Sequence, residues 1–227
     1  MRTYSILITG RTPFIMHHDN IEWADQMAAW GLDPKNASAS KAGDDRTPPY
    51  RWLGSLYDDG AHAVVPSDNV MRAIMTGGAM LRTGKGPKTF KAQTQSGMLA
   101  PDVFWAFKVG KTVETTPGDY RGIPIGPYRE NMETRTFDEF QQMAAADGFM
   151  LFVKRAKIGQ SKHIRVRPRF DNWSLTGDLV VTDEAITLAV LNQIGDLAGR
   201  YAGLGDWRPS SKTPGPYGMF GFTAKEK

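Results

Sequence analysis

Apolar and β-branched residues form short runs along the chain, and these runs predict a set of strands. Residues 3–9 are Thr-Tyr-Ser-Ile-Leu-Ile-Thr followed by Gly10, a pattern typical of a buried strand that ends in a turn. The basic stretch 154–169, centred on Gly159-Gln160-Ser161, is predicted to contain a β-hairpin. The other predicted strands are residues 61–65, 103–109, 149–153, 173–181 and 219–223.

Apolar residues spaced three and four apart predict four helices among these strands. Residues 184–201 have the most regular spacing. Each helix has a predicted N-cap, in chain order Asp19 or Asn20, Ser67 or Asp68, Thr136 in a capping box with Glu139, and Thr182 or Asp183. The first helix is predicted to end at Gly31 and the second at Gly77-Gly78.

The order of the predicted elements indicates the fold class. Helices and strands are segregated and do not alternate strictly, which favours an α+β fold over a doubly wound parallel sheet. Polar segments rich in Gly and Pro, at residues 32–49, 82–97 and 115–131, are predicted to be long loops. The sequence has no internal repeat and no obvious linker, so one elaborated domain is expected over residues 1–227.

Composition excludes several classes of protein. The chain has 227 residues and a formal net charge of +4, and a composition of 23% charged and 11% aromatic residues excludes an intrinsically disordered chain. It has no cysteine, which excludes disulfides, a thiolate nucleophile and cysteine-based metal sites. No apolar run reaches the roughly 18 residues of a membrane span, and residues 1–7 are too short and polar for a signal peptide. We therefore expect a soluble, cytoplasmic protein with no membrane partner.

The distribution of charge is more informative than its sum. Between Asp147 and Asp171 there is no acidic residue. Three arginines two positions apart would project from one face of a strand, and with nothing to neutralise them they favour an external polyanion such as a phosphate backbone. The alternative is an edge strand protected by charge against aggregation. The basic residues of this stretch, with one histidine, are Lys154, Arg155, Lys157, Lys162, His163, Arg165, Arg167 and Arg169.

Two other segments combine basic residues with aromatic side chains. The acid-free loop 82–97 contains the cations Arg82, Lys85, Lys88 and Lys91. Phe90 in this loop could stack on a base, or it could be a hydrophobic peg that anchors the loop to the core. The fragment around Lys85 does not match a phosphate-binding loop, because Gly86 stands where Ser or Thr is required. In the glycine-rich loop 203–218, the candidate contacts are Trp207, Arg208, Lys212 and Tyr217, although an ordinary connection is the alternative.

Catalytic and metal sites are not predicted. His17 and His18 are adjacent, so in an extended segment their side chains would point to opposite sides. No second ligand or base at a suitable spacing accompanies them. We expect no cofactor and no metal.

Three segments resemble the RAMP superfamily, the repeat-associated proteins of CRISPR systems, and specifically its backbone subunit on guide RNA. Residues 4–10 resemble the first strand with its glycine. Residues 64–72 resemble the strand–Pro–Ser–helix entry with its arginine, here Arg72. Residues 184–223 resemble the last helix, the glycine-rich loop and the final strand.

The resemblance implies a modified ferredoxin-like (RRM-like) core with a β-hairpin and insertions at about 18–50 and 82–135. It also implies a non-catalytic protein that polymerises along single-stranded guide RNA, in contact with copies of itself and other effector subunits, with target nucleic acid as a further partner. Aspartates in early loops cut target RNA in some members. Asp19, Asp33, Asp44 and Asp45 occupy such loops here without a recognisable motif. An endoribonuclease of the same fold and a viral structural or assembly protein are the alternatives.

Overall fold

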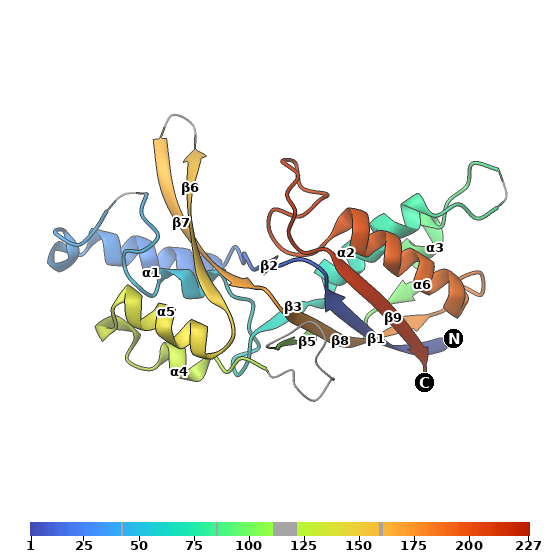
Figure 1. The fold of residues 1–227 in the computed structure, drawn as a ribbon, viewed down its shortest axis with the longest axis horizontal. Coiled ribbons are helices and arrows are strands. Elements are labelled where there is room, and N and C mark those ends of the chain that lie inside the picture. Colours follow the sequence, from blue (N-terminus) through green and yellow to red (C-terminus); the bar gives the residue numbers. More distant parts are fainter. Residues whose placement is uncertain (42, 85, 111–121, 159–160) are drawn as a thin grey trace. The chain divides into compact units, whose positions relative to one another are not determined.

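The chain folds into two compact units. The computed structural model describes residues 1–227 apart from 42, 85, 111–121 and 159–160 (Figure 1). Unit 1 comprises residues 1–15, 64–123 and 171–227, and unit 2 comprises residues 16–63 and 124–170. Each unit is therefore built from segments far apart in the sequence, which explains why no stretch with the composition of a linker separates them.

Unit 1 contains an antiparallel sheet with the strand order β3-β5-β8-β1-β9, to which the short β4 adds by pairing with β8. The strands of this sheet are β1 (Arg2–Gly10), β3 (Val64–Pro66), β4 (Met98–Leu99), β5 (Phe104–Val109), β8 (Trp173–Val181) and β9 (Phe220–Glu226). The unit also contains the short β2 (Phe14–Ile15), which is not part of this sheet. Its helices are α2 (Ser67–Met80), α3 (Lys91–Ser96), α6 (Leu188–Leu197) and a π-helical turn, Ala198–Ala202.

The core of unit 1 lies between one face of this sheet and two helices (Figure 1). In β1, Tyr4, Ile6 and Ile8 are buried while the intervening Leu7 is exposed, the alternation of a sheet covered on one side. Phe222 of β9 is paired with Ile8, and its ring lies against Gly195, so α6 covers the buried face. A Cβ atom at Gly77 of α2 would lie 2.3 Å from the carbonyl oxygen of Ile194, so glycine allows the two helices to approach closely.

Unit 2 combines short helices with a β-hairpin around an aromatic core. The indole of Trp52 lies 5.6 Å from the ring of Tyr128 and 5.8 Å from that of Phe140, both edge-on. Phe149 continues the cluster to Phe170 at 5.1 Å. Its elements are α1 (Ile21–Leu32), α4 (Gly126–Arg129), α5 (Phe137–Ala146), the 3-10 turns Pro34–Asn36, Arg51–Ser55 and Met132–Thr134, and the hairpin strands β6 (Met150–Ile158) and β7 (Ser161–Phe170).

The mixed α+β class and the capping box are confirmed. Thr136 Oγ1 accepts from the backbone N–H of Glu139 at 3.3 Å, and the N–H of Thr136 donates to the Glu139 carboxylate at 2.7 Å. The latter hydrogen bond, with that of the Thr136 hydroxyl, lowers the pKa of Glu139.

Several predicted boundaries were wrong. Gly77 and Gly78 lie inside α2, because they are contact points with other parts of unit 1, and α1 runs past Gly31 to Leu32. The last helix begins at Leu188 with Thr187 as its cap, and Thr182 and Asp183 precede it. The stretch 82–135 includes α3, β4 and β5, and both strands pair in the sheet of unit 1.

No helix among the described residues combines the length and the apolar character needed to cross a bilayer.

Candidate functional site

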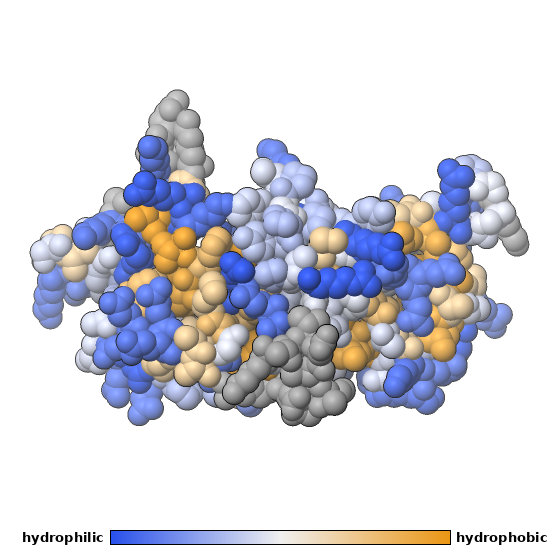
Figure 2. Space-filling model, viewed as in Figure 1, coloured by the Kyte–Doolittle hydropathy of each residue, from blue (hydrophilic) through white to orange (hydrophobic). Residues whose placement is uncertain are grey.

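The predicted hairpin is confirmed, and it brings most of the basic stretch together on unit 2. Strands β6 and β7 pair antiparallel along their full lengths, with residues 159–160 at the tip outside the described part. Figure 2 shows hydrophilic side chains near the tip end of these two strands, with hydrophobic side chains below them, nearer the base of the hairpin. The seven basic residues of the stretch all belong to this pair of strands, although the side chain of Lys157 is outside the described part.

The pairing register places the three arginines on one face. Residues directly opposite each other in an antiparallel pair share a face, and here Lys154 lies opposite Arg165 and Phe152 lies opposite Arg167. The arginine face, as we name it, consists of Lys154 and Phe152 of β6 and His163, Arg165, Arg167 and Arg169 of β7.

The other face of the hairpin is different. Val166 and Pro168 alternate with the arginines, and both are buried toward the core of unit 2. Arg155 and Lys162 also belong to this second face, nearer the tip, where both are exposed. The hairpin therefore presents cations on both faces near its tip and on the arginine face nearer its base.

The arginines of this face are held by specific contacts, which corrects the expectation that nothing neutralises them. Arg165 donates from Nη1 to the two carboxylate oxygens of Asp45 at 3.1 and 3.3 Å. The guanidinium of Arg169 lies 5.6 Å from the ring centre of Phe152, a cation–π distance. Arg167 lies 3.5 Å from Nε2 of His17. Phe152 was not predicted, and only the strand register reveals its place beside the arginines.

Part of the predicted long loop is attached to the outer edge of β7. The backbone N–H of Ile164 donates to the carbonyl oxygen of Gly43 at 2.7 Å, and the N–H of Asp45 donates back to Ile164 at 2.9 Å. Gly43 has φ +75°, and its missing side chain makes room for the ring of His163. This backbone pairing places the carboxylate of Asp45 beside Arg165.

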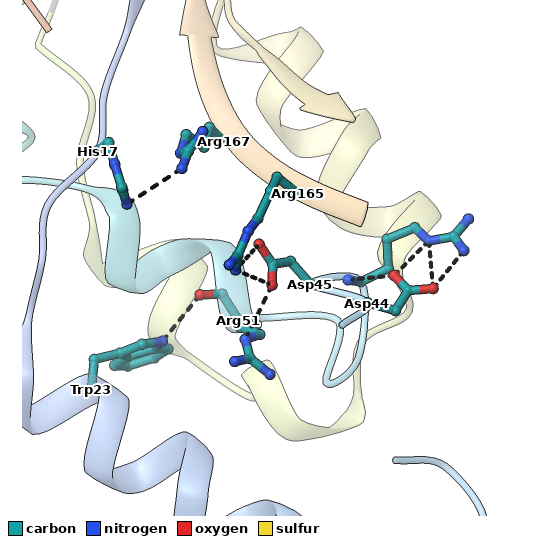
Figure 3. Close-up of polar contacts among 8 residues, drawn as sticks. His17, Trp23, Asp44, Asp45, Arg51, Arg165 and Arg167 are labelled. Carbon is teal, nitrogen blue, oxygen red and sulfur yellow. Dashed lines mark hydrogen bonds and ion pairs between the residues drawn. The ribbon is translucent and has the colours of Figure 1, made fainter. Parts of the chain in front are cut away.

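A hollow of about 140 Å³ lies next to these residues on unit 2. Figure 3 shows Arg165 and Arg167 extending from β7, with Arg165 facing Asp45 of the loop, and Arg51 of the following 3-10 turn approaching the same carboxylate. Arg51 was not predicted, because no motif marks it. The lining includes His17, His18, Asp19, Asn20, Trp23, Arg51, Asp45, Arg165 and Arg167.

The two adjacent histidines line the same hollow but have different partners. The Nδ1 atom of His18 lies 3.1 Å from the carbonyl oxygen of Leu56, and its ring stacks on Tyr57 at 4.6 Å. His17 is exposed and faces Arg167 (Figure 3). Among the described residues, no three His, Asp or Glu side chains are grouped so that they could hold a metal ion.

The early-loop aspartates have distinct surroundings. Asp44 is buried and bonds to the guanidinium of Arg46, with Nη2 2.6 Å from Oδ2, which holds the pKa of Asp44 below its ordinary value. Asp33 caps the turn that follows it, and Asp19 is exposed at the rim of the hollow. They do not converge on one point.

The second acid-free segment belongs to unit 1. Arg82, Lys88 and Lys91 are exposed, whereas Lys85 lies outside the described residues. Phe90 is only 7% exposed, and this burial favours the peg over a base-stacking platform. Its ring nevertheless borders a hollow that Lys88 and Lys91 also line. Arg72 is exposed on α2.

The glycine-rich loop is also on unit 1 and is held by its own side chains. Trp207 packs against Tyr217 with ring centres 5.4 Å apart, and a Cβ atom at Gly215 would strike its indole. The guanidinium of Arg208 donates to the carbonyl oxygen of Gly205 at 2.9 Å, a contact that closes the loop. Lys212 is exposed. These contacts give Trp207 and Arg208 a structural role and leave Lys212 as the accessible cation.

The chain was also compared with known protein families and with curated proteins, and neither comparison found a match.

Proposed function

We propose that this protein binds single-stranded RNA without cleaving it and assembles along the strand with copies of itself, as guide-RNA backbone subunits of the RAMP superfamily do. The observation that carries the proposal is the arginine face of the hairpin. Lys154 lies directly opposite Arg165, and Arg167 and Arg169 are on the same face, so this face concentrates cations that a phosphate backbone can bind. Arg165 keeps 32% of its side chain exposed although it is paired.

The topology of unit 1 supports the family proposal. Without the short β2, β3 and β4 and helix α3, its elements follow the order β1-α2-β5-β8-α6-β9, and the sheet order is β5-β8-β1-β9. This is a β-α-β-β-α-β arrangement with antiparallel neighbours, the pattern of a ferredoxin-like core. We therefore propose that unit 1 is the ferredoxin-like core and that the segments forming unit 2 are inserted into it.

Ribose-phosphate chains fit the arginine face because they carry regularly spaced anions. Guanidinium groups can donate two hydrogen bonds to one phosphate, and they also stack on bases. The ring of Phe152, with Arg169 over it, adds an apolar surface next to the cations, as in proteins that bind single strands without reading their sequence. A partner with only carboxylates could pair with the guanidinium groups but would offer no base to the ring of Phe152.

The test replaces Arg165, Arg167 and Arg169 together with alanine. Binding to a fluorescein-labelled single-stranded RNA, followed by anisotropy at several salt concentrations, should weaken more than tenfold at low salt. The slope of log affinity against log salt should fall by about 2, because each phosphate contact on a single strand contributes roughly 0.7. A variant with the same loss of charge, Arg200, Lys225 and Lys227 to alanine, is the control. Unchanged affinity of the arginine variant at low salt would contradict the proposal.

Purification separates the proposal from a viral assembly role. The ratio of absorbance at 260 and 280 nm, measured before and after RNase treatment, shows whether RNA accompanies the protein. Assemblies that persist without nucleic acid would favour a viral structural or assembly protein.

One observation favours endoribonuclease activity as the second candidate. His17 is exposed beside Arg167, so a general base would have a cation nearby to stabilise a developing phosphorane. If labelled RNA is cleaved, His17→Ala should abolish cleavage while leaving RNA affinity intact. Intact RNA after incubation with the wild-type protein removes this candidate.

A further inference from the structure

One carboxylate in unit 2 faces two guanidinium groups. Asp45 accepts from Nη1 of Arg165 at 3.1 Å, and its Oδ1 atom lies 3.6 Å from Nε of Arg51 (Figure 3). Arg51 comes from a 3-10 turn and Arg165 from β7, so the carboxylate joins two elements. Two cations and one anion leave the cluster with an excess positive charge.

The arginines of this cluster are more accessible than the carboxylate. The side chain of Asp45 is 14% exposed, compared with 40% for Arg51 and 32% for Arg165. Arg51 uses only Nε and Arg165 only Nη1, so both terminal nitrogens of Arg51, and Nε and Nη2 of Arg165, have no partner among the described residues. Asp45 therefore orients two guanidinium groups from within while most of their donors stay available.

The position of Asp45 is fixed by its backbone. Its N–H donates to Ile164, and Gly43, two residues before it, accepts from the same residue. Asp44, between them, is tied to Arg46. The carboxylate is thus held by a segment paired with β7, as expected of a group that positions others.

We propose that Arg51 and Arg165 form a binding subsite for one phosphodiester group, with Asp45 as its positioning residue. This inference rests on the proposed function and adds Arg51 to the RNA contacts. The phosphate accepts from the outward donors of both guanidinium groups, while Asp45 keeps the two cations close together against their mutual repulsion. Removing the negative charge of Asp45 should therefore weaken binding of a polyanion, opposite to the effect of net charge alone.

Arg129 and Asp58 provide a matched control. This pair also belongs to unit 2, its side chains are 45% and 16% exposed, and it lies outside the residues that line the hollow. Asp45→Asn and Asp58→Asn each remove one negative charge. Arg51→Lys and Arg129→Lys both leave the net charge unchanged. Only the first variant of each pair alters the subsite.

The experiment measures RNA affinity and thermal stability of the four variants. Asp45→Asn and Arg51→Lys should bind RNA roughly three- to tenfold more weakly than the wild type. In Asp45→Asn the guanidinium groups of Arg51 and Arg165 lose the carboxylate that aligns them, and in Arg51→Lys the ammonium group lacks the planar fork of a guanidinium. Their controls should stay within about twofold. If Asp45→Asn binds as tightly as Asp58→Asn, or more tightly, and melts normally, the proposal is wrong. Should Asp45→Asn fail to fold, equal affinities of Arg51→Lys and Arg129→Lys overturn it.

A phosphocellulose column separates this inference from the function on which it rests. Absence of RNA binding by the wild-type protein removes the proposed function alone. If Arg51→Lys then elutes at a lower salt concentration than Arg129→Lys, the phosphate subsite is supported, and its ligand is a phosphate-bearing polymer other than RNA. If the two elute together, the subsite is refuted as well.

Discussion

Asp44 shows how one buried carboxylate stabilises the segment that carries the candidate subsite. Its oxygens accept from the backbone N–H of Arg46 at 3.0 Å and from Nε at 2.9 Å, and Nη2 adds a third contact. The hydrogen bonds from the Arg46 side chain are the largest cause of the lowered pKa of Asp44, and burial opposes them. Because Asp44 and Arg46 are both in this loop, their pairing is local and fixes its turn.

The lowered pKa of Asp44 predicts a pH-dependent stability. Since the pKa is depressed in the folded state, the pair stabilises the fold above the ordinary value of 3.8, and this contribution is lost as the pH falls through the lower, folded-state pKa. Asp44→Asn should therefore lower the free energy of unfolding at neutral pH, and the difference from the wild type should shrink below about pH 4. Urea unfolding at several pH values measures it.

The exposed Asp25 of α1 serves as the control for this experiment, since it forms no ion pair with any described residue. Asp25→Asn should leave the free energy of unfolding within about 0.5 kcal/mol of the wild type at neutral pH. A difference for Asp44→Asn that persists undiminished at pH 3 would show that the pair is not its source.

At the scale of elements, helix α6 allows the caps predicted and observed to be compared directly. The hydroxyl of Thr187 accepts from the N–H of Val190 at 3.3 Å, whereas Thr182 lies five positions before it. Thr187→Ala should lower the free energy of unfolding by about 1 kcal/mol, the usual cost of losing an N-cap. Thr182→Ala, at an exposed position, should have almost no effect. Equal effects in chemical denaturation would place the start of the helix elsewhere.

Local patterns predicted the elements well where the determinants are close in sequence. Strand β8 was predicted at its observed bounds, Trp173–Val181, and the Thr136 capping box is present. The predicted helix end at Gly77 was wrong, because this glycine lies inside α2 where the absence of a side chain lets α6 approach closely. Local sequence cannot distinguish a glycine that ends a helix from one that permits a close contact.

The candidate site shows the same limit more strongly. The basic hairpin was visible in the sequence because its cations are adjacent and unmixed with acids. The pairing of Arg165 with Asp45 was not, since 120 positions separate them and only the attachment of the loop to β7 brings them together. Arg51 was missed because no motif marks it, although it lies only six positions after Asp45. For Phe90 the sequence is compatible with two roles, base stacking and packing, and its burial favours packing.

At the scale of the whole molecule, the two basic regions belong to different units. The arginine face is part of unit 2, while Arg82, Lys88 and Lys91 are part of unit 1. A single strand that contacted both would join the units by way of its phosphates. The salt dependence of binding can detect this, because it counts phosphate contacts wherever on the protein they are made.

We therefore predict that the contributions of the two regions to the salt slope add. Replacing Arg82, Lys88 and Lys91 with alanine should lower the slope by about 2, and adding the three alanines on β7 should lower it by about 4 in total. The same labelled RNA and anisotropy measurement apply to both variants. Sites that share no partners are expected to be additive in this way. A loop variant that keeps the wild-type slope would restrict RNA contact to unit 2, and the exposed cations of unit 1 would then have another role.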